Sequence, residues 1–196
     1  MTNILLLLHG YTQNADIISN KIKKLCSKSL LSNYEIISPD GTYHIDDIKR
    51  GWWELESPEI FAKSHEYKEY NKAIDKISDC LNHLSSDDNL YIIGFSQGAV
   101  LCEMMLIHNL FKIKPKKVIL ISPSGIMDNR FHLTKKINLD IPILVIIGNN
   151  EGVFGITNEN YEKYSFIEKY EIINHDSGHV IPSNYKMKEK IRLYIS

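Results

Sequence analysis

Cysteine is scarce in this chain: its 196 residues include three, Cys26, Cys80 and Cys102. The number is odd, and the three form no C-x-x-C pair or other set with metal-ligand spacing. All three lie in stretches with a helical pattern. A disulfide framework and a structural zinc site are therefore not expected, and we interpret the three thiols as small buried apolar groups.

An excess of charge of either sign is also missing. The formal net charge is −1, the pI is about 6.7, and the charged residues are mixed along the chain. This balance gives no reason to expect nucleic acid or an anionic membrane as a partner. A small molecule is the predicted partner, and nothing in the sequence sets the oligomeric state.

Long hydrophobic runs are absent as well. The first apolar run, residues 4–8, has no charged leader before it and is shorter than the core of a signal peptide. No other run approaches the ~20 apolar residues of a membrane helix. No repeat, low-complexity tract or linker divides the chain. The sequence therefore predicts a soluble, cytoplasmic protein without membrane insertion, built as a single domain over residues 1–196.

Short apolar runs alternate with helical patterns along the chain. Four of the six runs are apolar almost without alternation, as in strands covered on both faces, which favours a parallel sheet. The expected strands are residues 4–8, 35–38, 90–93, 117–122, 143–147 and 170–174, and the expected helices are residues 15–31, 67–84, 99–110, 158–169 and 185–194. This order predicts an α/β fold, a doubly wound and mostly parallel sheet of six strands flanked by helices, with helix 99–110 the most buried.

The motif Gly94-Phe95-Ser96-Gln97-Gly98 lies between the third expected strand and the third expected helix. This pattern is typical of a nucleophile elbow, a sharp turn that exposes a serine hydroxyl and needs glycines to avoid neighbouring backbone. The helix that begins there directs free amides and its positive dipole end toward the serine. A match of five residues also occurs in plain glycine-rich turns. The strand and helix around it favour a hydrolase with Ser96 as the nucleophile.

Polar loops follow the other expected strands at the same edge of the sheet, where parallel α/β proteins place their sites. A serine needs an imidazole to remove its proton. His179, in the loop after the last strand, is the predicted base, with His175 as the alternative. These two histidines also imitate a zinc-binding H-E-x-x-H helix, but Ser177, Gly178 and Pro182 argue against a helix. No metal is therefore predicted.

A carboxylate must orient the imidazole and stabilise its charged form, and in this motif it lies between the serine and the histidine in sequence. Glu151, which follows the fifth expected strand, is the predicted acid. Asp128 is the alternative, with Asp140 and Asp176 after it. A solvated loop carboxylate is the ordinary interpretation of Glu151.

Two backbone amides must receive the negative charge of the tetrahedral intermediate. One is predicted to be that of Gln97, the residue after the nucleophile, and the other that of Tyr11, in the loop after the first strand. His9-Gly10 is then expected to form the turn that aims the Tyr11 amide at Ser96, while the His9 imidazole braces neighbouring loops.

Four motifs occur in order along nearly the whole chain: Leu5-Leu6-Leu7-Leu8-His9-Gly10-Tyr11-Thr12-Gln13-Asn14, Arg50-Gly51-Trp52-Trp53, Gly94-Phe95-Ser96-Gln97-Gly98-Ala99 and Ser177-Gly178-His179-Val180-Ile181-Pro182. With these motifs the chain resembles the FSH serine hydrolases, the group that includes the ovarian-cancer-associated gene 2 proteins. The resemblance implies an α/β-hydrolase core, a serine esterase activity without a cofactor, a nucleophile at Ser96 and a base at His179.

The chain departs from that family at the acid. Where the family usually has an aspartate after the fifth strand, this chain has Gly148-Asn149-Asn150-Glu151. The longer carboxylate either reaches His179, or the chain is a weakened or nonenzymatic relative. The acyl-protein thioesterases share a similar L-H-G and G-F-S-Q-G pair, but they match less of the chain.

Large aromatic residues fall in the long connection after the second strand. Trp52 and Trp53, with Tyr43 and Phe61, are predicted either to line an acyl pocket or to seal the core beneath the loop. Phe154 is open to the same two interpretations. No sizeable insertion supplies a lid, so an open site for small or short-to-medium acyl esters is expected.

The combined prediction is a carboxylesterase-like serine hydrolase that needs no cofactor and takes a small-molecule ester. It forms an acyl-enzyme on Ser96, with His179 as base and Glu151 as acid. One alternative is an enzyme like the acyl-protein thioesterases. The other is a noncatalytic binding module, which a hydrolase fold alone does not exclude.

Overall fold

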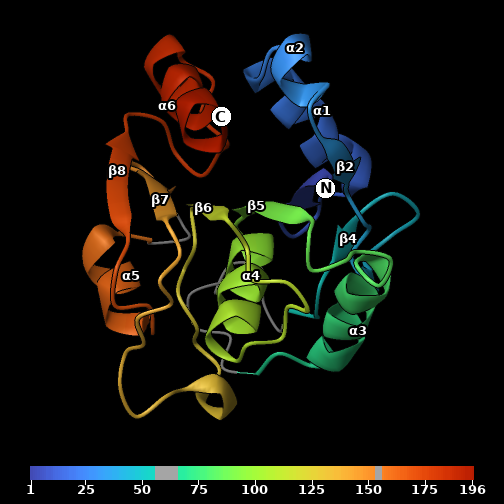
Figure 1. Ribbon diagram of the computed structural model, residues 1–196. Helices are drawn as coiled ribbons and strands as arrows, with labels where there is room; N and C mark the ends of the chain where they lie inside the picture. The colour runs from blue at the N-terminus through green and yellow to red at the C-terminus, as the bar shows by residue number, and fades with distance from the viewer. Residues whose placement is uncertain (56–65, 153–155) are drawn as a thin grey trace.

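The structure is a computed structural model that describes residues 1–55, 66–152 and 156–196 (Figure 1). Six parallel strands form the central sheet in the order β2-β1-β5-β6-β7-β8. They are β1 (Asn3–Leu8), β2 (Glu35–Ile37), β5 (Asn89–Phe95), β6 (Lys117–Ile121), β7 (Ile143–Gly148) and β8 (Glu171–His175). All six predicted strands are present, each with ends within two residues of the prediction.

Helices cover both faces of the sheet (Figure 1). On one face, α1, α2 and α6 pack on a core that includes Leu5, Leu7, Ile93 and Ile121. On the other face, α3, α4 and α5 pack on the larger core. The helices are α1 (Ala15–Leu25), α2 (Lys28–Leu31), α3 (Tyr70–Cys80), α4 (Gln97–Ile107), α5 (Asn158–Tyr164) and α6 (Tyr185–Ile195).

The order in which the chain forms the strands determines where a ligand site is expected. From β1 the chain moves outward to β2, then returns to the other side of β1 at β5 and continues to β8. The point of reversal therefore lies between β1 and β5. In open α/β sheets the carboxyl ends of the strands at this point form the ligand crevice. Here they carry the loop after Leu8 and the turn at Ser96.

Helices α3 and α4 differ from their predicted ranges by two to four residues at each end, and two other predicted helices differ more. The expected helix over residues 15–31 is broken at Cys26, where the backbone is extended, and Ser27 then caps α2 by accepting a hydrogen bond from Leu30 N. The expected helix over residues 158–169 ends at Tyr164 because Ser165 is extended. Two short strands, β3 (Tyr43–His44) and β4 (Arg50–Gly51), form an antiparallel pair that the sequence did not predict.

Helix α4 is the most buried helix, as predicted from its apolar composition. All eleven of its residues are buried. None of the helices formed by the described residues is long and apolar enough to cross a bilayer.

One buried residue of α4 is a carboxylate, Glu103, which has no exposed surface. Its Oε1 accepts hydrogen bonds from Ser165 Oγ at 2.6 Å and Phe166 N at 3.3 Å. Its Oε2 has no partner among the described residues. Burial disfavours the charged form and raises the pKa of Glu103 to about 7.

Replacing Glu103 by glutamine is expected to remove a pH dependence of stability. The folded-state pKa of about 7 lies above the ordinary value of 4.5, so the unfolded chain releases this proton first as the pH rises. The free energy of unfolding therefore falls by about 3 kcal/mol through this group between these two pKa values. Denaturant unfolding should show Glu103→Gln more stable than the wild type at pH 8 and similar to it at pH 4. An equal difference at both pH values would contradict this assignment.

Candidate active site

Ser96 lies at the junction of β5 and α4 in a strained conformation, with φ 53° and ψ −119°. The glycines on either side of it allow this turn. A Cβ on Gly98 would lie 2.3 Å from the Leu8 carbonyl oxygen, and a Cβ on Gly94 would lie 2.7 Å from Ala99 Cα. Both obstacles are backbone atoms, so neither can rotate away. The local geometry is thus that of a nucleophile elbow.

His179 lies beside the serine hydroxyl. Its Nε2 is 2.8 Å from Ser96 Oγ, and its ring packs on Phe95 with 5.2 Å between the ring centroids. The loop that carries it connects β8 to α6. The distance between His179 Nε2 and Ser96 Oγ is within hydrogen-bond reach, as a general base requires.

Glu151 contacts the other nitrogen of His179. Its Oε2 forms a hydrogen bond with His179 Nδ1, and its Oε1 accepts from Gly148 N and Ser122 Oγ, each at 2.8 Å. The side chain is almost completely buried. Burial acts to raise the pKa of Glu151, but the hydrogen bond and charge of His179, with the bonds from Gly148 and Ser122, outweigh it and hold this pKa below its ordinary value.

Ser122 is a residue of the site to which the sequence assigned no role. It directly follows β6, has no exposed surface and adopts a positive φ of 50°. Strain of this kind persists where the surrounding structure fixes the residue, often at functional sites. The available signal was its place at the carboxyl end of a buried strand, the same edge that carries Ser96. Its hydroxyl fixes the carboxylate of Glu151.

The structure places the alternative acids elsewhere. Asp128 is buried, but its carboxylate binds the Arg130 guanidinium and Tyr67 N. Asp140 is exposed near Lys114, and Asp176 accepts a hydrogen bond from Asn149. Of the four candidates, Glu151 is the one that the structure brings to His179.

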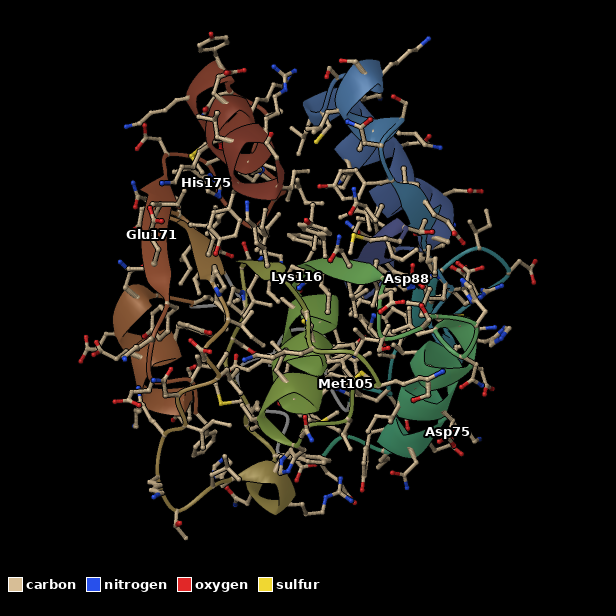
Figure 2. All side chains as sticks on the ribbon, in the orientation of Figure 1. Asp75, Asp88, Met105, Lys116, Glu171 and His175 are labelled. Carbon is tan, nitrogen blue, oxygen red and sulfur yellow. The ribbon has the colours of Figure 1, made fainter. Side chains whose placement is uncertain are left out.

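The alternative base, His175, ends β8 and is buried (Figure 2). Its Nδ1 accepts a hydrogen bond from Ser177 N at 3.2 Å. Burial lowers the pKa of His175, which favours the neutral ring that this bond requires. His175 thus supports the loop that carries His179.

The two predicted oxyanion donors are available for a ligand. Among the described residues, neither the Tyr11 N–H nor the Gln97 N–H donates to a protein acceptor. The Gln97 side chain is fully buried and binds the neighbouring loop, accepting from Trp52 N at 2.8 Å and donating to Trp53 O at 2.9 Å. The segment of residues 52–55, which follows β4, is thereby attached to the residue after the nucleophile.

His9 connects the first loop to the same segment. Its Nε2 accepts a hydrogen bond from Gly41 N at 2.8 Å, which places the ring proton on Nδ1, 2.8 Å from the Gly10 carbonyl oxygen. Trp52 stacks on the imidazole and donates from Nε1 to the His9 carbonyl oxygen. Burial lowers the pKa of His9. A neutral His9 therefore braces the loops around Tyr11, in the arrangement expected for it.

The two tryptophans pack in the core. Trp52 and Trp53 are 0% and 1% exposed, and Trp53 stacks on Tyr67 with 4.4 Å between ring centroids. Both also border a cavity of about 160 Å³. Their burial fits the interpretation in which they seal the core, and a role in an acyl pocket stays a prediction. Phe61 and Phe154 lie outside the described residues.

The described residues contain no group of three or more His, Cys, Asp or Glu side chains placed to hold a metal ion. The site instead contains a hydroxyl, an imidazole and a carboxylate linked by hydrogen bonds. In this arrangement a proton can pass from Ser96 to His179 while the Glu151 charge stabilises the imidazolium.

A model of the family described as serine hydrolase (FSH1) matches residues 1–191. A search of curated protein sequences gave no match.

Solved structures share the fold over almost the entire chain. A carboxylesterase from Mesorhizobium loti is 18% identical with a TM-score of 0.70, and the alignment covers 98% of this chain and 88% of that one. YahD, in a structure with malic acid, is 15% identical with a TM-score of 0.74 and coverages of 98% and 94%. SOBER1 from Arabidopsis thaliana is 17% identical with a TM-score of 0.64 and coverages of 99% and 97%. At such identities the likeness shows the fold, and the predicted α/β-hydrolase class is confirmed.

Proposed function

The chain belongs to the serine hydrolase (FSH1) family, and from that premise we propose that it cleaves carboxylic esters by transferring the acyl group to Ser96. The observation that carries the proposal is the unbroken contact from Ser96 Oγ through His179 to Glu151. A hydroxyl is a weak nucleophile at neutral pH unless a base removes its proton, and this contact supplies the base.

In the first half of the reaction, His179 Nε2 takes the proton of Ser96 as Oγ attacks the ester carbonyl carbon. The carbonyl oxygen becomes negatively charged and accepts hydrogen bonds from the Tyr11 and Gln97 amides. His179 then gives its proton to the leaving alkoxide oxygen, which departs as the alcohol and leaves the acyl group on Ser96. In the second half, a water molecule gives a proton to His179 as its oxygen attacks the acyl carbon. The bond to Ser96 Oγ then breaks, His179 returns the proton to Oγ, and the acid is released.

Glu151 keeps the proton of neutral His179 on Nδ1, which leaves Nε2 free to accept. It also stabilises the positive charge that the ring gains. Its lowered pKa supports this role, because an ionised carboxylate is needed for both effects. Ser122 and Gly148 bind Oε1 and so fix the direction of Oε2.

The proposed substrates are esters with small or short-to-medium acyl groups, and no cofactor takes part in the scheme. A thioester substrate would follow the same steps with a thiolate leaving group. The noncatalytic alternative was favoured by the altered acid loop. Because Glu151 forms a hydrogen bond with His179, the altered loop is no longer a reason to favour the noncatalytic alternative.

The proposal is tested by steady-state and rapid-mixing kinetics with p-nitrophenyl acetate, butyrate and octanoate, together with butyryl thioesters. We expect turnover of the shorter esters, with a burst of one p-nitrophenol per protein wherever deacylation is slow. Folded protein that turns over none of these esters or thioesters would contradict the proposal. A preference for the thioesters would favour the thioesterase alternative.

A further inference from the structure

The charges that are mixed along the sequence are sorted by the fold. The layer formed by α1, α2 and α6, which we call the basic layer, covers one face of the sheet (Figure 1). Its helices contain eight basic and two acidic residues, although the whole chain has a net charge of −1. The rest of the molecule is therefore net negative. The basic side chains are Lys21, Lys23, Lys24, Lys28, Lys186, Lys188, Lys190 and Arg192.

Lys21 of this layer lies next to the candidate active site. Its Nζ is 5.8 Å from the centroid of the Phe95 ring. That ring precedes the nucleophile in sequence and packs on His179, with 5.2 Å between centroids. The Phe95 ring thus lies beside both the Lys21 ammonium group and the imidazole proposed as the base.

The ammonium group of Lys21 has no anionic partner among the described residues. Within residues 1–55, 66–152 and 156–196, no carboxylate lies within ion-pair distance of it, whereas Lys190 is paired with Glu171 and Arg192 with Glu189. Lys21 is also partly buried, and this burial lowers its pKa. A partly desolvated cation without a partner gains more from an added anion than an exposed one does.

The proposed reaction fixes which part of a substrate approaches Lys21. His179 must give its proton to the leaving oxygen, so the alcohol portion of the ester lies on the His179 side of Ser96. Phe95 packs on His179, and Lys21 lies over Phe95. An alcohol portion that passes His179 along the Phe95 ring would therefore approach the ammonium group.

We propose that Lys21 forms a subsite for a carboxylate carried by the alcohol portion of the ester, so that the preferred substrates are esters of hydroxy acids. This inference rests on the ester hydrolysis proposed above. The basic layer around Lys21 raises the local concentration of anions, and a substrate of this charge is drawn toward the side of the molecule on which its leaving group binds.

The test compares two acetyl esters that differ in charge and hardly in leaving-group chemistry: 3-(4-acetoxyphenyl)propionate and its neutral primary amide. In the wild type we expect kcat/KM to favour the anionic ester. Lys21→Met keeps most of the apolar stem, and it is expected to lower the ratio of anionic to neutral kcat/KM about 10-fold while the neutral ester changes little. Lys21→Arg should preserve most of the ratio. Lys24→Met, on an exposed lysine of the same helix, is the matched control and should leave the ratio unchanged.

An unchanged ratio in Lys21→Met, or an equal loss for both esters, would overturn the subsite. The preference should also weaken as salt is raised from 20 to 500 mM, since the attraction is electrostatic. A protein that cleaves neither ester would contradict the ester hydrolysis, and the subsite is then judged by binding alone. Calorimetric titration with 3-(4-hydroxyphenyl)propionate should still show weaker binding by Lys21→Met than by the wild type. No binding to the wild type, or equal binding to both proteins, would reject it.

Discussion

Replacing Ser96 by alanine is expected to lower kcat for ester cleavage by about 10⁶-fold, and replacing His179 by alanine should have a comparable effect. The two residues act as one unit, because the imidazole has no proton to remove without the hydroxyl and the hydroxyl is not activated without the imidazole. The double variant should therefore be hardly slower than either single variant. The measurement is kcat and KM for a p-nitrophenyl ester, with circular dichroism to show that each variant is folded.

Ser124→Ala is the matched control for these variants. Ser124 is also a buried serine in the loop after β6, but its hydroxyl donates a hydrogen bond to the Gly125 carbonyl oxygen and, among the described residues, forms none with Ser96, His179 or Glu151. Removing the Ser124 hydroxyl should leave kcat within about twofold of the wild-type value, as expected for a residue outside the catalytic network. Losses of Ser96→Ala and His179→Ala that multiply in the double variant would show that the two residues act independently, contrary to the mechanism.

Replacing Glu151 by glutamine is expected to lower kcat by about 10³- to 10⁴-fold with little effect on KM. The glutamine Oε1 can still accept from Ser122 and Gly148, so the side chain should stay in place. Its NH₂ would then face His179 Nδ1 and donate to it. The ring proton would move to Nε2, where it blocks acceptance of the Ser96 proton, and the imidazolium would lose its counter-charge.

Two variants separate this effect from a general loss of negative charge. Asp176→Asn alters an exposed carboxylate in the His179 loop, and Asp128→Asn removes the acid that the sequence left as the alternative. Neither should change kcat of the folded protein by more than about twofold, although Asp128→Asn should lower stability because Arg130 loses its buried partner. If Glu151→Gln left kcat unchanged and Asp128→Asn lowered it strongly, the acid would be Asp128.

The sequence predicted the architecture because the signals for it are local. Buried parallel strands appear as short apolar runs, and the elbow glycines lie within two residues of the serine that they expose. The order Ser96, Glu151, His179 follows from the motif, and the edge of the sheet that collects them follows from the parallel strands. Glu151 was the predicted acid, although the sequence left open whether this longer side chain reaches His179, and the structure places the two in contact.

Contacts between distant segments were beyond the reach of the sequence. The bond from Ser122 to Glu151 joins loops after two neighbouring strands, and the bonds from Gln97 to Trp52 and Trp53 join the elbow to an irregular loop. None of these contacts leaves a periodic pattern in the sequence from which it could be predicted. The helix predicted up to residue 169 ends early because Ser165 turns toward Glu103, an interaction across the core that overrides local propensity.

The basic layer was invisible in the sequence for a similar reason. Its lysines come from helices near the two ends of the chain, so they form no block of like charge along it. They gather when α1 and α6 pack side by side on one face of the sheet. Net charge describes the whole chain and says nothing about how the fold distributes it.

The central claim is that His179 and Glu151 activate Ser96, and one measurement tests it most directly. The folded wild type and Ser96→Ala are incubated with a fluorophosphonate, and the intact masses are compared. Since phosphonylation requires an activated serine, we predict one adduct on the wild type and none on Ser96→Ala, with strongly slowed labelling of Glu151→Gln. Wild-type protein that stays unmodified while folded, or a Ser96→Ala variant that is labelled as fast as the wild type, would contradict the claim.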